Sequence, residues 1–204
     1  MKGYKVIEIA RVEKTNDMTG IIRLIYETDD YIYPTMCGSN YSLFKTVMKK
    51  LLFTDTIFSY KNIFAANETE KTIGLLLYFA KGCKLPEAID KYHKINKDQA
   101  ADFDYVIHEY FAQVLSKIDG DCLYINNLCV DKENRRRGIA AKLINHLMQT
   151  YPNKKIVLDC LEENTAAVEL YIKSGYKITE HFLGFTGKQK EQIKCIKLEL
   201  IPYR

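Results

Sequence analysis

The sequence predicts an α/β protein built on a mixed α+β sheet, with parallel pairing between its central strands. Strand-like and helix-like apolar patterns alternate from residue 122 onward. The apolar spacing also changes from strand-like at 128–130 to helical at 143–148. A chain of 204 residues with 47% hydrophobic content can bury one sizeable core. We therefore expect one domain over residues 1–204.

The first part of the chain predicts a strand, two helices and a β-hairpin. Apolar residues alternate in the first segment, and Asn16-Asp17 then offers a cap for a helix. A second helix presents one apolar face, and a polar turn separates the two strands that follow it. In order, we expect a strand at 4–12, a helix around 21–25, an aromatic turn at 28–34, a helix over 41–52, and strands near 61–67 and 72–80.

Residues 81–120 predict a helical insertion in front of the central strand. Gly82 and Pro86 break the preceding pattern, and apolar residues then recur at helical spacing from Phe103 to Ile118. After this insertion the pattern returns to alternating strands and helices. The expected elements are strands at 122–130, 155–161, 176–184 and 193–200, with helices at 138–150 and 164–174.

The loop after the strand at 122–130 has the features of a phosphate-binding site. A helix N-terminus presents unpaired N–H groups and the positive end of the helix dipole, which suit an anion. Gly138 and Ala140 are small enough for close approach of the backbone, and the arginines at 135–137 add charge. Neither the Walker pattern nor the dinucleotide G-x-G-x-x-G pattern occurs, so we expect a third type of phosphate loop. The alternative is an ordinary amphipathic helix with a basic, solvated start.

A second segment, over residues 164–176, predicts a helix with one unusual residue. Asn164 is a good N-cap, and Gly175 is a natural C-terminal stop. Ala167 keeps one side of the helix slim, on the same stripe as Tyr171. Tyr171 is either a core tyrosine with a satisfied hydroxyl or a proton donor beside a bound ligand.

Together these two segments resemble the GCN5-related N-acetyltransferase (GNAT) family. Residues 130–140 are similar to the family's V-x-P-x-x-R-G-x-G-x-G/A segment, and Arg135, Gly138 and Ala140 match its [QR]-x-x-G-x-[GA] core. Residues 164–176 resemble its N-x-x-A-x-x-L-Y-x-x-x-G-[FY] segment. The two motifs occur in the expected order and are separated by a predicted helix and strand.

The resemblance covers roughly residues 122–176 and implies a GNAT-like acyl-CoA N-acyltransferase fold. It implies that a primary amine of a small molecule or peptide attacks the thioester of acetyl-CoA directly, in a ternary complex. Tyr171 would be the general acid, because a phenol of pKa about 10 stays protonated and can donate to the departing thiolate. A backbone N–H near Cys129 or Val130 would be the oxyanion donor. The implied cofactor-binding residues are Leu128, Cys129, Val130, Arg135, Arg136, Arg137, Gly138, Ile139, Ala140, Ala141, Asn164, Ala167 and Tyr171.

The chain departs from the family pattern at several positions. Asn126 and Asn127 replace the glutamate that many relatives carry on this strand, and an amide cannot accept a proton outright. Lys132 stands where proline is common and Arg136 where glycine is common, so a left-handed backbone at Arg136 would weaken phosphate binding. The general base therefore stays open among Asp121, Glu162, Glu163, His108, Glu109 and His181. The candidate substrate contacts are Tyr31, Tyr33, Asn126 and Asn127.

Composition bears on the other classes of function. The net charge of +4, from 30 basic and 26 acidic residues, does not demand a nucleic-acid partner. The six cysteines form no C-x-x-C pair, so we expect no metal site and a reducing, cytoplasmic setting. No apolar run approaches the roughly 18 residues of a membrane span. The strand at 193–200 and the insertion could supply a homodimer surface.

Three other functions stay open at this point. The missing strand carboxylate allows a non-catalytic acyl-CoA sensor. The arginines at 135–137, with Lys142, Lys154 and Lys155, allow a nucleic-acid-binding module, although the charge concentrates at one helix start. Cys129 allows a ping-pong route, but no histidine is an obvious partner for it in the sequence.

Overall fold

The computed structural model describes residues 6–14, 16, 18–89, 97–186 and 191–201. Within them, seven strands form one sheet in the order β1-β2-β3-β4-β5-β7-β6. The strands are β1 (Ile7–Arg11), β2 (Ile63–Glu68), β3 (Lys71–Ala80), β4 (Cys122–Val130), β5 (Lys155–Leu161), β6 (Lys177–Thr186) and β7 (Glu191–Leu200). The α-helices are α1 (Met18–Tyr26), α2 (Ile32–Met36), α3 (Tyr41–Leu51), α4 (Lys97–Asp104), α5 (Ala112–Ser116), α6 (Ile139–Thr150) and α7 (Thr165–Lys173).

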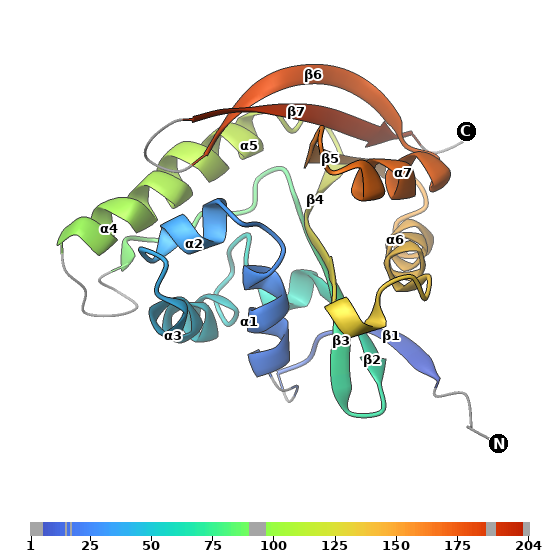
Figure 1. The fold of residues 1–204 in the computed structure, drawn as a ribbon, viewed down its shortest axis with the longest axis horizontal. Coiled ribbons are helices and arrows are strands. Elements are labelled where there is room, and N and C mark those ends of the chain that lie inside the picture. Colours follow the sequence, from blue (N-terminus) through green and yellow to red (C-terminus); the bar gives the residue numbers. More distant parts are fainter. Residues whose placement is uncertain (1–5, 15, 17, 90–96, 187–190, 202–204) are drawn as a thin grey trace.

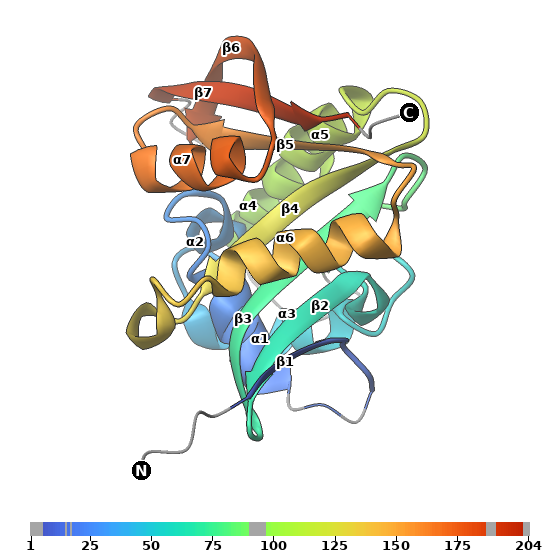
Figure 2. The same ribbon diagram turned by 90° about the vertical axis from the view of Figure 1, so that its right-hand side faces the viewer.

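Two hydrophobic cores lie on opposite faces of β3. Leu75 and Leu77 belong to the core beneath α1, α2, α3 and the α4–α5 helix, whereas Leu76 and Tyr78 belong to the core beneath α6 and α7. Figure 1 shows the two groups of helices on either side of β3 and β4. Figure 2 shows α6 lying across β2, β3 and β4. Because both faces of β3 are covered, its sequence is an almost continuous apolar run.

The parallel pairing between β4 and β5 is short. It joins residues 122–124 of β4 to residues 155–157 of β5 and stops there, although both strands continue. At the same point β4 carries a bulge: Ile125 pairs with Tyr78 and Asn127 with Leu77, which leaves Asn126 without a register partner. A bulge bends its strand and increases the local twist. The second half of β4 therefore presents main-chain groups on the β5 side that the sheet does not use.

The structure confirms the predicted mixed sheet with a central parallel pair. It also corrects the aromatic turn predicted at 28–34, because α2 begins inside it at Ile32. The Asp29 carboxylate accepts hydrogen bonds from the N–H groups of Tyr31 and Ile32 and so starts the helix. Pro34 is tolerated there because it lies in the first turn, where an N–H has no intrahelical partner.

Other boundaries differ in detail from the sequence predictions. The insertion predicted at 81–120 is helical from Lys97 to Ser116, and a stretch of π-helix at Tyr105–Phe111 joins α4 to α5. Asn16, predicted as a helix cap, instead accepts a hydrogen bond from the N–H of Glu13. Asp17 and residues 4 and 5 of the first predicted strand lie outside the described residues. Among the described helices, none is long and apolar enough to cross a membrane.

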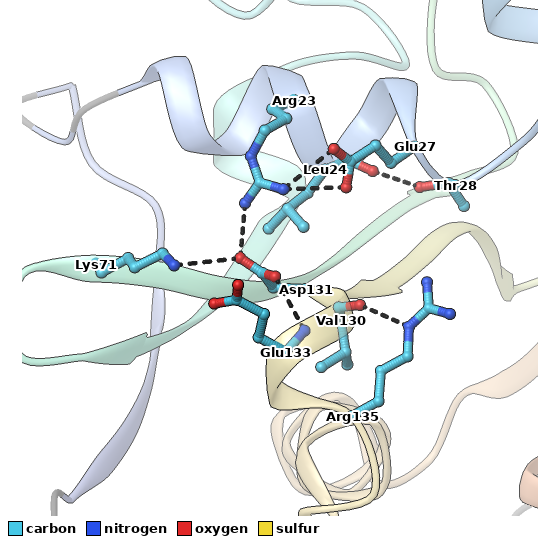
Figure 3. Close-up of polar contacts among 9 residues, drawn as sticks. All are labelled: Arg23, Leu24, Glu27, Thr28, Lys71, Val130, Asp131, Glu133 and Arg135. Atoms are coloured by element: carbon cyan, nitrogen blue, oxygen red, sulfur yellow. Dashed lines mark hydrogen bonds and ion pairs between the residues drawn. The ribbon is translucent and has the colours of Figure 1, made fainter.

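Asp131 connects the loop after β4 to two other parts of the fold (Figure 3). Its Oδ2 lies 2.9 Å from Nη2 of Arg23 on α1 and 3.4 Å from Nζ of Lys71 on β3. Its Oδ1 accepts a hydrogen bond from the N–H of Glu133, and its own N–H donates to the carbonyl of Ile73. Burial disfavours the charged form, but the Glu133 N–H and the Arg23 guanidinium outweigh it and lower the pKa of Asp131.

We predict that Asp131→Asn lowers the free energy of unfolding by about 1.5–3 kcal/mol at neutral pH, the range for hydrogen bonds to a charged group. The pKa of Asp131 is lower in the folded protein than in the unfolded chain, where it has the ordinary value of about 3.9. The stabilisation is therefore fully present above about pH 3.9 and is lost as the pH falls through the pKa of Asp131 in the folded protein. Urea denaturation at several pH values measures both effects. Asp121→Asn is the matched control, because Asp121 is an exposed carboxylate paired with Lys154. Equal losses in the two variants would contradict the role of Asp131.

Candidate functional site

A cleft of about 590 Å³ lies between the second half of β4, the start of α6 and one side of α7. We call it the β4–α6 cleft. It brings together twelve of the thirteen residues that the sequence assigned to cofactor binding, from three separate elements. They are Leu128, Cys129, Val130, Arg135, Arg136, Gly138, Ile139, Ala140, Ala141, Asn164, Ala167 and Tyr171.

The remaining residue, Arg137, points elsewhere. Its guanidinium pairs with Glu68 of β2 at 2.5 Å and donates a hydrogen bond to Oδ1 of Asn134. Arg135 lines the cleft and donates from Nε to the carbonyl of Val130, which ties the loop back to the end of β4. The three consecutive arginines therefore do two different things: Arg137 secures the loop from outside, whereas Arg135 and Arg136 face the cleft.

The loop that leads into α6 contains two left-handed residues. Gly138 has φ +73° and Arg136 has φ +63°. A left-handed backbone costs about 1–2 kcal/mol for a residue with a Cβ, so Arg136 is strained and Gly138 is not. Gly138 is the N-cap of α6 and offers no side chain to cap it. The first N–H groups of α6 are thus left for another acceptor, and the small residues Ala140 and Ala141 line the cleft beside them.

α7 forms the opposite wall of the cleft. Oδ1 of Asn164 accepts a hydrogen bond from the N–H of Ala167, so Asn164 is the N-cap that the sequence predicted. Tyr171 is 7% exposed and packs edge-on against Tyr176, with ring centroids 5.6 Å apart. Its hydroxyl makes no hydrogen bond to any residue in the described part of the chain. Burial above all raises the pKa of Tyr171, so this phenol stays protonated at neutral pH.

A second cavity, of about 260 Å³, lies where α2 and the helix at 105–117 face β5, β6 and β7. We call it the β5–β6 cavity. Of the four predicted substrate contacts only Tyr31 lines it. Tyr33, Asn126 and Asn127 instead form a hydrogen-bonded cluster: the Tyr33 hydroxyl donates to Oδ1 of Asn127 at 2.9 Å, and Nδ2 of Asn126 donates to both. With Tyr33 2% and Asn127 1% exposed, this cluster supports the bulge of β4 from within.

The β5–β6 cavity contains two carboxylates that sequence reasoning missed. Asp159 extends from β5, and Asp29 precedes α2. Burial raises the pKa of Asp159 against the opposing effects of Lys117, Lys197 and the Tyr124 hydroxyl. Burial likewise raises the pKa of Asp29. The sequence did mark Asp159 as a candidate functional residue, because Asp159 is the one charged residue in the apolar run at 156–161.

The bases considered from sequence are mostly surface groups. Asp121 pairs with Lys154, and Glu162 pairs with His181 at 3.2 Å. His108 and Glu163 are exposed. Glu109 is also exposed, but it is the one member of the set that lines the β5–β6 cavity.

The cysteines are all free thiols. Burial raises the pKa of Cys129, which keeps it protonated and therefore a poor nucleophile. In the described residues no group of three or more histidine, cysteine, aspartate or glutamate side chains is placed to hold a metal ion.

Comparisons with solved structures show the fold. The chain superposes on an N-acetyltransferase from Staphylococcus aureus Mu50 with a TM-score of 0.61 at 19% identity, covering 95% of this chain and 100% of the other. It is similar to the ribosomal-protein-S18-alanine N-acetyltransferase of Escherichia coli, with a TM-score of 0.57 at 13% identity over 98% and 96% of the two chains. Arabidopsis thaliana NAA60 in complex with acetyl-CoA gives a TM-score of 0.57 at 16% identity over 96% and 99%.

Comparisons of sequence match parts of the chain. The cysteine-rich protein 2-binding proteins of Mus musculus and Homo sapiens are 43% identical over 65 residues, which is 32% of this chain and only 8% of theirs. The profile of the acetyltransferase (GNAT) family matches residues 61–176, from β2 through both motifs to the end of α7. With more than half of its length matched and both motifs lining one cleft, the chain belongs to the GNAT acetyltransferase family.

Proposed function

We propose that the protein is an N-acetyltransferase that uses acetyl-CoA and a primary amine in a ternary complex. The observation that carries this proposal is the uncapped start of α6, which opens into the same cleft as the unpaired half of β4 and Tyr171. The acetyl-CoA bound to Arabidopsis thaliana NAA60, which shares the fold, supports the choice of cofactor. The further comparison with a NatC complex bound to CoA and a peptide supports a peptide or small-molecule amine as acceptor.

The residues of the cleft fit the parts of coenzyme A. N–H groups at the start of α6, with Arg135 and Arg136 at the rim, would hold the pyrophosphate. Main-chain groups of Leu128, Cys129 and Val130 would pair with the pantetheine amides as an added strand does. When bound, acetyl-CoA supplies an activated acetyl thioester. A backbone N–H near Cys129 or Val130 would then donate to the acetyl carbonyl.

Two side chains would move the protons. The acceptor amine must be neutral to attack, and removing a proton from an ammonium of pKa about 10.4 costs about 4–5 kcal/mol at pH 7. Asp159 would accept this proton, since its raised pKa makes it a stronger base than an exposed carboxylate. Tyr171 would donate a proton to the departing thiolate. Asn126 and Asn127 would act on the substrate only indirectly, because both are hydrogen-bonded to the Tyr33 hydroxyl.

The alternatives separate on specific observations. A nucleic-acid module would need a free basic surface, but Arg137 is paired with Glu68. A non-catalytic sensor would bind acetyl-CoA without turnover, and the protonated Tyr171 beside the cleft favours the enzyme.

We also propose that the chain forms a single domain and that it can form a homodimer. We propose a cytoplasmic location, which the six free cysteines support.

Acetyl-CoA is expected to raise the melting temperature, by the equivalent of about 2.7 kcal/mol at one hundred times its Kd, while duplex DNA gives no shift. Gly138→Ala should reduce the shift, because an alanine disfavours the left-handed backbone by about 1–2 kcal/mol and lets the free loop relax away from the binding conformation. Gly120→Ala is the matched control, with φ +60° and equally open space around it. A wild type that does not respond to acetyl-CoA would remove the enzyme hypothesis.

Tyr171→Phe should lower kcat by about 10²-fold with little change in the Kd of acetyl-CoA, since only the proton donor is lost. Steady-state kinetics and calorimetry measure the two quantities. Tyr176→Phe is the control, because Tyr176 is equally buried, has an unpartnered hydroxyl and lies outside the cleft. Unchanged turnover in Tyr171→Phe would dismiss the acid role.

Asp159→Asn should lower kcat/KM by about 10²-fold and change its pH dependence. Since the pKa of Asp159 is raised, the wild type should lose activity on the acid side with a midpoint above the ordinary value of about 3.9. The asparagine variant should lack this acid limb. A variant that keeps the wild-type pH profile would show that another group is the base.

A further inference from the structure

The β5–β6 cavity is lined by more negative than positive side chains. Among the described residues that line it, the charged ones are the carboxylates Asp29, Glu109 and Asp159 and one cation, Lys117. The ammonium of Lys117 lies 4.2 Å from the centre of the Phe182 ring, which lines the same cavity. A cavity with this balance favours a positively charged occupant.

Asp29 lacks a cationic partner among the described residues. Its Oδ1 accepts hydrogen bonds from the N–H groups of Tyr31 and Ile32, at 2.7 and 2.5 Å, but these donors are neutral. The charged group that acts on it is another carboxylate, Asp30. Asp159, by contrast, is partly compensated by Lys117 and Lys197. A carboxylate removed from water without a counter-ion is costly, so Asp29 is the natural partner for a ligand cation.

Tyr110 provides a second, independent observation. It lines the same cavity, and its hydroxyl makes no hydrogen bond to any described residue. Both Asp29 and Asp159 lie close enough to act electrostatically on it. One cavity is therefore bounded by two carboxylates and an unpartnered hydroxyl. The aromatic residues Tyr31 and Tyr105 also line the cavity, and aromatic rings can attract cations.

The size of the cavity limits the occupant. Its volume of about 260 Å³ lies below the roughly 300–1,000 Å³ of pockets for drug-sized ligands. The occupant that fits both size and charge is a small molecule with more than one amino group.

We propose that the acceptor is a small diamine, whose non-reacting ammonium is held by Asp29 while the other nitrogen faces the acetyl donor. This inference rests on the proposed acetyltransferase function. The reacting nitrogen loses a proton to Asp159, and its lone pair forms the C–N bond. As the C–S bond breaks, its electron pair goes to sulfur, which takes a proton from Tyr171. Solvent returns the proton of Asp159 to Tyr171, so the products are one amide and one thiol.

The test compares two acceptors that differ only in the distal amine, 1,4-diaminobutane and 1-aminobutane. Release of thiol from acetyl-CoA gives kcat/KM for each, and we expect the wild type to favour the diamine at least tenfold. Asp29→Asn should bring this ratio to within threefold of unity. The asparagine keeps Oδ1 for the N–H groups of Tyr31 and Ile32, so the start of α2 is preserved and only the charge is removed.

Asp30→Asn is the matched control. Asp30 is the adjacent aspartate, is exposed and does not line the cavity, so this variant should keep the wild-type ratio. Calorimetry with 1,4-diaminobutane in the presence of coenzyme A gives a readout that does not depend on turnover. Binding should be at least tenfold tighter to the wild type than to Asp29→Asn.

The outcomes distinguish this inference from the proposed function. Equal use of the two amines, an unchanged ratio in Asp29→Asn, or preference for a peptide N-terminus over every diamine would overturn the diamine acceptor and leave acetyl transfer intact. Diamine binding without acetyl-CoA binding or thiol release would overturn the acetyltransferase function instead. Absence of diamine binding by calorimetry would overturn the inference whatever the kinetics show.

Discussion

The early end of the parallel ladder between β4 and β5 is the constraint on which the rest of the structure depends. Backbone groups in a sheet are normally paired, and here pairing stops after Tyr124 while both strands continue. The bulge at Asn126 bends β4 at the same place, and the bonds among Tyr33, Asn126 and Asn127 support it from the core. The β4–α6 cleft is then lined by the open half of β4, and the β5–β6 cavity by residues 159–161 of β5.

Anchors outside the cleft offset the strain in the phosphate loop. Arg136 occupies a left-handed backbone, a conformation that persists only where its surroundings determine it. Asp131 fastens the loop to α1 and β3, and Arg137 fastens it to β2. These ion pairs involve residues up to 108 positions apart in the chain. They allow the N–H groups of α6 to face the cleft before any anion arrives, so less ordering is required on binding.

The charged residues that line the two cavities differ in sign, and this difference supports the occupants that we propose for them. The β4–α6 cleft combines a helix N-terminus with Arg135 and Arg136, which suits a multiply charged anion. The β5–β6 cavity combines Asp29 and Asp159 with aromatic rings, which suits an amine. In the proposed function, the acyl donor with its phosphates and the acceptor with its ammonium groups would therefore bind in different cavities of one sheet.

The sequence by itself determined the elements and the cleft that depend on local pattern. Helical and strand periodicity, the cap at Asn164 and the glycine at 138 act over a few residues, so the motifs at 130–140 and 164–176 could be read directly. Tertiary structure alone decided which charged groups meet. Arg137 pairs with Glu68, and the Tyr33 hydroxyl donates to Asn127. Asp29 and Asp159 line one cavity, although they lie 130 positions apart in the chain. Such pairings follow from the packing of distant elements, and periodicity along the chain carries no information about them.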